Sequence, residues 1–176
     1  MASAVQLRQR FAEVRAELAT AVGPDQLASE IARWRRGLTV AVDHCWLRAA
    51  LACLPAEVPP PQVINSGCPL DPLTVDTFIT VGLGAIPETG TVIVAASEPQ
   101  AWRLTLVAPR QLIVIPAPQA ALEFSAALAL TTANPGSVLW ITGPSRTADI
   151  EKVLVPGAQG AHELIVVIYQ DPVEKT

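Results

Sequence analysis

The hydrophobic positions along the chain change their spacing several times, and each change predicts a different element of secondary structure. Between residues 5 and 22, apolar side chains recur at intervals of three and four, which is typical of one face of an amphipathic helix. These positions are Leu7, Phe11, Val14, Leu18 and Val22. We therefore expect a single helix over residues 5–22.

A second helix is predicted directly after the first. Pro24 suits a first helical turn, because the N–H that proline lacks would have no partner there. The buried face of this helix would consist of Leu27, Ile31 and Trp34. Gly37 would cap its C-terminus. Residues 1–37 thus form an N-terminal helical pair, which would either cover one side of the fold or mediate a homodimer.

Beyond residue 37, short apolar runs alternate with helical patterns. Residues 38–43 read as a strand and residues 44–54 as a helix, followed by a proline-rich connector that can continue neither. Further strands are predicted at 62–65, 78–85, 91–97, 111–117, 137–142 and 163–169. Helices are predicted at 118–131 and at about 147–155.

This alternation predicts the fold class. Several runs are continuously apolar, as expected for strands that are covered on both faces. Strands interleaved with helices imply right-handed crossovers and a mainly parallel sheet. We therefore expect a three-layer α/β fold, in which residues 38–172 form the main domain and the helical pair packs with it as one compact unit.

Composition excludes several classes of function. The chain has 176 residues, of which 51% are hydrophobic and 16% charged, with a net charge of −4. This charge argues against nucleic acid as the main partner. No apolar stretch reaches the roughly 18 residues of a membrane span, and no secretory signal begins the chain, so a cytoplasmic location is expected.

The few cysteines and histidines give no pattern of metal ligation. Cys45, Cys53 and Cys68 form no C-x-x-C pair and no obvious ligand set with the two histidines, His44 and His162. We expect the histidines to be surface or capping residues. The chain itself is predicted to hold no metal, no cofactor and no iron–sulfur cluster.

The clearest candidate for ligand binding is the segment GPSRTADIE at residues 143–151. Gly143 permits a tight turn and Pro144 fixes the direction of the chain. Ser145 or Thr147 could cap the helix predicted to follow, which would leave backbone N–H groups free near the positive end of its dipole.

Arg146 adds a permanently charged, planar fork that suits a carboxylate or a phosphate. The segment would then bind a small anion. The alternative is a self-contained cap in which Arg146 pairs with Asp149 or Glu151. Local sequence does not separate these two interpretations.

A second candidate is the turn ETGT at residues 88–91, between two apolar runs. Gly90 would allow a positive φ, and Thr89 and Thr91 could bond to nearby backbone groups. Glu88 could act as a base, as a nucleophile or as an anchor for a substrate hydroxyl. The alternative is an ordinary hairpin turn with an exposed acid.

Arg103 lies among apolar residues, where an unpaired charge would be costly. It is predicted to pair with an acid, and Glu88 is the leading partner. A surface arginine whose stem covers apolar side chains is the alternative.

These motifs together resemble the LUD-domain family, and within it the lactate-utilisation protein C branch. The resemblance rests on ETGT, on Arg103, and on GPSRTADIE with its follow-on PGAQGAHELIVVI, and it covers roughly residues 38–170. It implies the α/β fold shared by sugar-phosphate isomerases and CoA transferases. Gln111 and Gln159 stand where relatives often have histidine, and Pro87 stands where alanine is usual.

The resemblance also implies a role. Proteins of this kind act in the oxidation of L-lactate to pyruvate beside two iron–sulfur partner proteins, so this chain would be an accessory subunit or factor. The matched positions are then the candidate ligand-binding residues: Thr89, Gly90, Thr91, Arg103, Gly143, Pro144, Ser145, Arg146, Thr147 and Asp149. Glu88 is the candidate catalytic residue.

Two other functions stay open on the sequence alone. One is a stand-alone enzyme of the isomerase or CoA-transferase type, in which Glu88 is nucleophile or base and residues 145–147 hold phosphate or CoA. This interpretation rests on analogy of fold. The other is a non-catalytic sensor of a small acid, which a ligand would stabilise without turnover.

Overall fold

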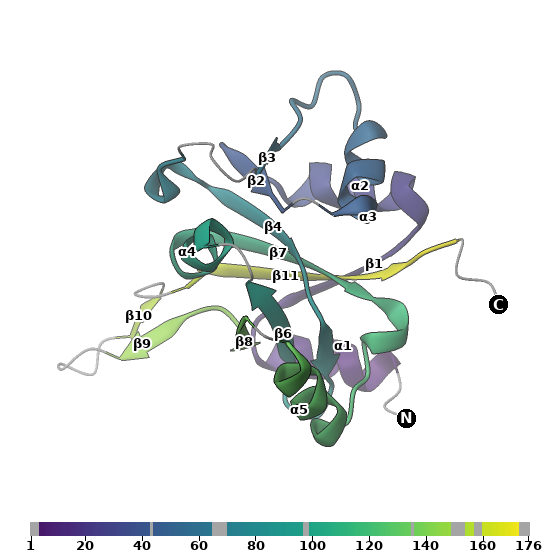
Figure 1. Ribbon diagram of the computed structural model, residues 1–176, viewed down its shortest axis with the longest axis vertical. Coiled ribbons are helices and arrows are strands. Elements are labelled where there is room, and N and C mark those ends of the chain that lie inside the picture. The colour runs from purple at the N-terminus through teal and green to yellow at the C-terminus, as the bar shows by residue number, and fades with distance from the viewer. Residues whose placement is uncertain are drawn as a thin grey trace.

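A parallel sheet of six strands forms the centre of the protein, as the computed structural model in Figure 1 shows. The structure describes residues 4–42, 44–64, 70–96, 99–134, 136–148, 154–156 and 160–172. Within them, the strand order of this sheet is β1-β11-β7-β4-β2-β3. The strands are β1 (Glu17–Val22), β2 (Thr39–Ala41), β3 (Gln62–Val63), β4 (Thr77–Val81), β7 (Arg110–Pro116) and β11 (Glu163–Gln170).

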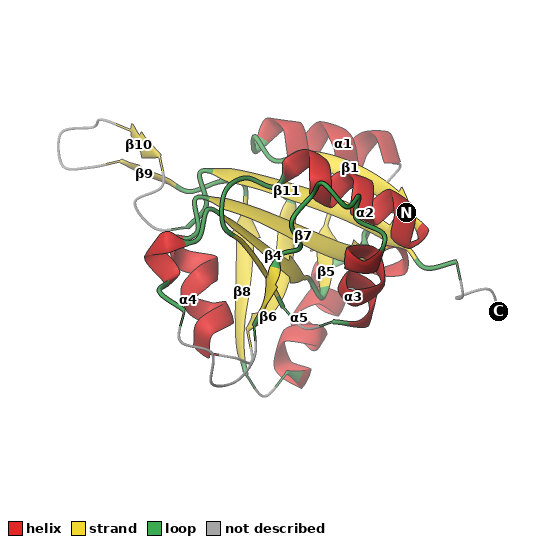
Figure 2. Ribbon diagram, turned by 90° about the horizontal axis from the view of Figure 1, so that it is seen from above, coloured by secondary structure: helices red, strands yellow, loops and turns green. Residues whose placement is uncertain are grey.

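Two smaller antiparallel sheets complete the strands of the described region. One consists of β5 (Gly84–Ile86), β6 (Thr91–Ala96) and β8 (Ser137–Thr142), in the order β5-β6-β8. The other pairs β9 (Arg146–Ala148) with β10 (Leu154–Pro156). The β9–β10 pair projects away from the body of the protein (Figure 2).

The helices lie on both faces of the six-stranded sheet (Figure 1). They are α1 (Ala4–Glu13), α2 (Gly23–Trp34), α3 (Cys45–Ala52), α4 (Pro99–Val107) and α5 (Phe124–Ala133), with single 3₁₀ turns at Pro72–Thr74 and Ala117–Gln119. Helices α2 and α3 cover one face, whereas α1, α4 and the three-stranded sheet cover the other. Helix α5 packs on the outer side of the three-stranded sheet. The predicted three-layer, mainly parallel α/β fold is therefore confirmed.

Strand β7 is buried on both faces, which explains why residues 112–115 are all apolar. Leu112 and Val114 pack in the cluster beneath α2 and α3, whereas Ile113 and Ile115 pack against α1 and β6. Successive side chains of a strand point to opposite faces, so a strand buried on both faces requires apolar residues at every position.

The prediction of one helix over residues 5–22 is wrong. Helix α1 ends at Glu13, and residues 17–22 form β1, an edge strand parallel to β11. Arg15 adopts a φ of 59°, the Ala16 N–H bonds to the Phe11 carbonyl at 2.8 Å, and the Arg15 N–H bonds to Ala12. Helices commonly end in this way, with one residue of positive φ after the last turn, and that residue is usually glycine.

The second helix is confirmed, except at its C-terminus. Leu27 and Ile31 on α2 are fully buried, but the residue that caps the helix is Arg35, so the prediction of Gly37 as the cap is wrong. Gly37 instead has a φ of 42° and lies so close to Asp76 that a Cβ would stand 1.9 Å from its carboxylate. The Asp76 carboxylate accepts a hydrogen bond from the Leu38 N–H at 2.9 Å.

The last two predicted helices differ from the structure. Helix α5 begins only at Phe124, after the 3₁₀ turn. The helix at 147–155 is wrong, because β9 and β10 pair antiparallel there with Thr147 opposite Val155. Residues 149–153 lie outside the described residues. β-Branched side chains favour strands, which accounts for this outcome.

None of the helices in the described residues has the length and the apolar content that crossing a bilayer would require.

Candidate ligand-binding cleft

The structure brings two of the predicted motifs together. Strands β6 and β8 pair so that Thr91 lies opposite Thr142, directly before the GPSR segment. The Thr91 hydroxyl shares hydrogen bonds with the hydroxyl of Thr89 at 2.6 Å and with that of Thr142 at 2.8 Å. The ETGT turn and the segment that starts at Gly143 therefore meet at one corner of the three-stranded sheet.

Both motifs rest on the C-terminal end of α1. Gly90 and Gly143 have φ values of 66° and 72°, which confirms the positive φ predicted for Gly90. A Cβ on Gly90 would lie 3.1 Å from the Arg10 carbonyl oxygen, and one on Gly143 would lie 2.2 Å from the Val14 carbonyl oxygen. Only glycine permits so close an approach at Gly143, so the loop is held tightly against α1.

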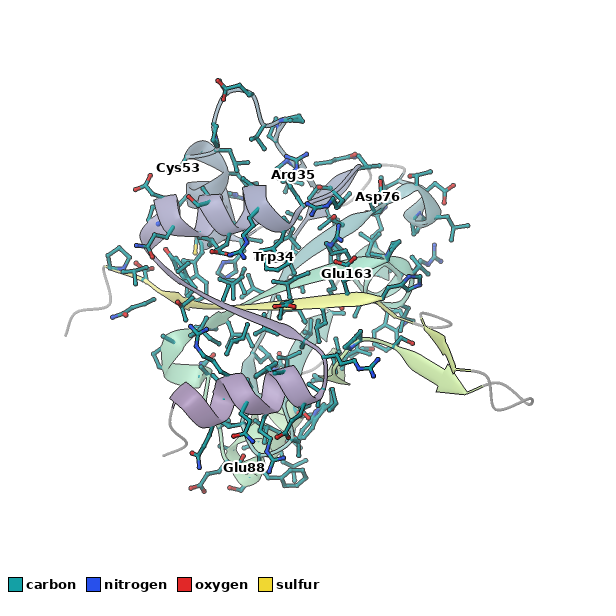
Figure 3. All side chains as sticks on the ribbon, turned by 180° about the vertical axis from the view of Figure 1, so that it is seen from behind. Trp34, Arg35, Cys53, Asp76, Glu88 and Glu163 are labelled. Atoms are coloured by element: carbon teal, nitrogen blue, oxygen red, sulfur yellow. The ribbon has the colours of Figure 1, made fainter. Side chains whose placement is uncertain are left out.

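Glu88 and Arg103 do not form the ion pair that was predicted. Glu88 is exposed on the hairpin turn and lies at the edge of the molecule near α1 (Figure 3). Arg103 is exposed on α4, whose buried residues are Ala101, Leu104 and Thr105. The helical period turns Arg103 outward, which is the surface-arginine alternative. The two side chains, both of them described, share no ion pair.

A cleft of about 440 Å³ opens beside this corner. Its lining comes from the end of α1, from α4, from the starts of β7 and β11, from β8, and from the loop after β8. The residues are Glu13, Val14, Thr105, Leu106, Gln111, Leu139, Trp140, Ile141, Thr142, Gly143, Pro144, Ser145, Gly160, Ala161 and Leu164. Of the predicted ligand-binding residues, Gly143, Pro144 and Ser145 line the cleft.

The loop after β8 is fixed by backbone hydrogen bonds. The Ser145 N–H bonds to the Ala161 carbonyl at 2.8 Å, and the Gly160 N–H bonds to the Leu106 carbonyl at 2.6 Å. The loop leads into strand β9 at Arg146, so the predicted N-terminus of a helix does not follow the loop. The side chains of Arg146 and Thr147, and all of Asp149, lie outside the described part of the structure.

Gln111 is the residue of the cleft that sequence analysis did not select as a site. It is the second residue of β7, with Phe78 of β4 and Leu164 of β11 opposite it on the two sides. Its side chain is 1% exposed, and its Nε2 is the one buried side-chain nitrogen or oxygen of the described residues that has no hydrogen-bond partner. A buried amide without a partner is costly, so such groups are rare in proteins.

The position of Gln111 places the cleft at the amino ends of β7 and β11. Ligands of open α/β sheets usually bind at the opposite edge, beyond the carboxyl ends of the parallel strands. The GPSR segment does follow the end of a strand, but that strand, β8, belongs to the antiparallel sheet. One signal for Gln111 was available: it is the single polar residue of the apolar run 111–116.

The rim of the cleft carries one described acid. Glu13 forms an ion pair with Arg10 at 2.6 Å and accepts a hydrogen bond from the side chain of Gln9 at 3.0 Å. The bond from Arg10, then that from Gln9, lowers the pKa of Glu13. The rim acid therefore stays ionised, and the guanidinium of Arg10 offsets its charge.

None of the described histidines and cysteines is among the residues that line the cleft. His44 caps α3, its ring nitrogen accepting a backbone N–H at 3.3 Å, and His162 is exposed, as predicted. Cys45 and Cys53 are exposed thiols. Cys68 lies outside the described residues. Among the described residues, no group of three or more histidines, cysteines, aspartates or glutamates could hold a metal ion.

The comparisons with known proteins agree with this architecture. A family model of the LUD domain matches residues 70–169, more than half of the chain. The chain belongs to the LUD-domain family. The matched span includes the ETGT turn, Gln111 and the GPSR segment.

One solved structure supports the fold of this LUD domain protein. The crystal structure of a DUF162 family protein from Deinococcus radiodurans is similar, with a TM-score of 0.64 and 21% sequence identity. The similarity covers 94% of each chain. At this identity the similarity establishes the fold alone. A search of curated proteins gave no match.

Proposed function

We propose that this LUD-domain protein is an accessory component of L-lactate oxidation to pyruvate, and that it binds a small carboxylate in the cleft. The oxidation releases two electrons and two protons, and the iron–sulfur clusters of partner proteins would accept the electrons. The observation that carries the proposal is that the ETGT turn and the GPSR segment meet at the corner beside the cleft, through the bond between Thr91 and Thr142.

The predicted ligand-binding residues would have different roles in binding the carboxylate. The turn at Gly143–Ser145 offers backbone groups and the Ser145 hydroxyl. Arg146 would supply the positive charge that a carboxylate requires, with Asp149 orienting its guanidinium. Thr89, Gly90 and Thr91 would hold the loop in place. Arg103 would contribute to ligand binding from the exposed face of α4.

The alternative function is a stand-alone enzyme of the isomerase or CoA-transferase type. The observation in its favour is that the Glu88 carboxylate is exposed and so accessible to a substrate. Such an enzyme would lose its turnover, or its covalent glutamyl thioester, in the variant Glu88→Gln. Turnover unaffected by Glu88→Gln would exclude it. A sensor of small acids would show stabilisation by ligand without turnover.

The proposal is tested by growth on L-lactate as the sole carbon source. A deletion strain should fail to grow, and the intact gene should restore growth. The variant Arg146→Ala should restore it poorly, since a bond to a charged ligand contributes about 1.5–3 kcal/mol. Arg33→Ala, an exposed arginine of α2 on the opposite face, is the matched control and should restore growth fully. Normal growth of the deletion strain would contradict the proposal.

A further inference from the structure

The floor of the cleft contains a hydrogen-bond donor that no described residue satisfies. Gln111 sits between two neighbouring strands, so its backbone is held on both sides by the sheet. Its Nε2 is buried and lacks a hydrogen-bond partner among the described residues, and Gln111 is one of the residues that line the cleft. A rigid, desolvated donor at the bottom of a cleft is prepared for an oxygen atom of a ligand.

Polar and apolar groups share the lining of the cleft about equally, and the apolar part lies on β8, α4 and β11. Leu139 and Ile141 alternate with Trp140 along β8, so they share one face of that strand, and Ile141 packs with the cluster that contains Val14. Leu106 of α4 and Leu164 of β11 complete this surface. Leu106 is 37% exposed, so apolar surface is available at the opening of the cleft.

The size of the cleft sets a second requirement for the ligand, which concerns its volume. Its volume of about 440 Å³ falls within the range of roughly 300–1,000 Å³ that holds drug-sized ligands. A three-carbon acid would fill only a small part of it and would leave the apolar walls in contact with water. A longer apolar substituent would cover these walls and gain the free energy of burial.

We propose that the cleft selects a 2-oxo or 2-hydroxy carboxylic acid whose side chain is apolar and larger than a methyl group. An oxygen of the acid accepts the hydrogen bond from Gln111 Nε2, and the side chain lies against Leu139, Ile141 and Leu106. The acid head rests on the proposed function, whereas the preference for a larger side chain rests on the cleft itself. Gln111 is thus a binding and specificity residue.

The first experiment is calorimetric titration of the full chain with four acids: L-lactate, pyruvate, 4-methyl-2-oxopentanoate and phenylpyruvate. We expect the two larger acids to bind at least about tenfold more tightly than pyruvate, the ratio that 1.4 kcal/mol of added burial gives. Equal affinities, or tighter binding of pyruvate, would overturn this inference. The proposed role in lactate oxidation would then still stand or fall with the growth assay. Binding of none of the acids would overturn both this inference and the carboxylate part of the proposal.

The second experiment tests the donor directly. Gln111→Met keeps the length of the side chain and removes the amide, so binding of 4-methyl-2-oxopentanoate should weaken at least about tenfold, since a bond to a charged group is lost. Without ligand, this variant should melt at a higher temperature, because the unsatisfied amide is gone. A lower melting temperature with unchanged affinity would show that Gln111 is structural and would overturn the inference.

Two further variants keep the test independent of folding. Gln119→Met changes the same residue type on the 3₁₀ turn away from the cleft lining, and it should alter neither affinity nor the preference among acids. Leu139→Phe fills the cleft from a half-buried position. It should weaken phenylpyruvate binding several-fold and leave pyruvate binding nearly unchanged. An equal effect on both acids would contradict the proposed place of the side chain.

Discussion

The two faces of strand β7 meet very different surroundings within a few residues. On the face covered by α2 and α3, Arg110 forms an ion pair with Glu163 of β11, which Figure 3 labels, and Leu112 lies in a closed core. On the other face, the amide nitrogen of Gln111 has no partner among the described residues, and Ile113 lies in the core beneath α1. The face covered by α2 and α3 is closed at the start of β7, whereas the face beneath α1 opens there into the cleft.

This comparison shows where a layered fold makes room for a ligand. The strand itself is regular on both faces, so the difference lies in the layer above it. Two helices packed together close the α2–α3 face. The other face is covered by separate pieces, and the cleft forms where α1, α4 and the three-stranded sheet meet. A binding site thus arises from an incomplete cover, without any irregularity of the sheet.

The largest effect should come from a cavity in the closed face. Leu112→Ala removes a fully buried side chain and should lower the free energy of unfolding by about 2–5 kcal/mol. Leu139→Ala is the matched change in the cleft wall, where the side chain is half-buried, and should cost about 1 kcal/mol. Urea denaturation measures both. Similar losses would contradict the distinction between a closed and an open face.

The next effect should come from the glycine that holds the loop of the cleft. Gly143→Ala combines a positive φ with a Cβ only 2.2 Å from the Val14 carbonyl oxygen, and should destabilise the protein by about 2–4 kcal/mol. Gly23→Ala has nearly the same φ, 74°, but its nearest neighbour is 3.7 Å away. Its loss should be only about 1–2 kcal/mol. Thermal melting of both variants separates the clash from the backbone strain.

A smaller effect is expected from the hydroxyl that joins the two motifs. Thr91→Val keeps the shape of a buried side chain and removes its bonds to Thr89 and Thr142, which should cost about 0.5–1.5 kcal/mol. Thr91→Ser retains the hydroxyl and serves as the control for hydrogen bonding. Calorimetric unfolding measures the stability of both variants. If Thr91→Val is as stable as the unaltered protein, the hydrogen bonds between the hydroxyls do not stabilise the corner.

The smallest effect should appear in the alkaline titration of the closed face. Burial raises the pKa of Tyr169, and the charges of Asp171 and Cys45 raise it further. Because the folded-state pKa lies above the unfolded value of about 10, the stability from this group is present below that pH and is lost as pH rises through the folded-state pKa. Tyr169 is the one tyrosine of the chain, so phenolate absorbance reports it alone.

Asp171→Asn is the matched change for this titration. It removes one negative charge near the ring and should lower the pKa of Tyr169 only in part, since burial is the larger cause. A titration of the unaltered protein at the ordinary tyrosine value would contradict the closed character of this face.

The regular centre of the fold could be predicted from the sequence, because its signals are local. Strands β7 and β11 are uninterrupted apolar runs, and the positive φ of Gly90 follows from the lack of a side chain. The prediction over residues 5–22 failed because Leu18 and Val22 are four apart, a spacing that places two residues on one face of a helix and also on one face of a strand. The helix ends at Glu13, and the residue of positive φ that follows it is Arg15, so no glycine marks the turn.

The site was predictable only in part, for a different reason. The ETGT and GPSR motifs could be selected by residue type, but their meeting depends on the pairing of β6 with β8. The expected ion pair of Glu88 and Arg103 failed because the helical phase of α4 turns Arg103 outward. Gln111 was visible as a polar residue in an apolar strand. Its missing partner is a property of the packed protein, and no local pattern records it.

The pairing of β1 with β11 has a consequence for how the protein folds. Glu17, near the start of the chain, lies opposite Ile165, near its end, so this part of the sheet joins distant segments. Such pairings slow folding, because a long loop must close before the contact forms. During synthesis, β1 must wait until β11 has left the ribosome. Gly160, Ala161 and Leu164 lie in β11 or directly before it, so the cleft is completed only after β11 is available.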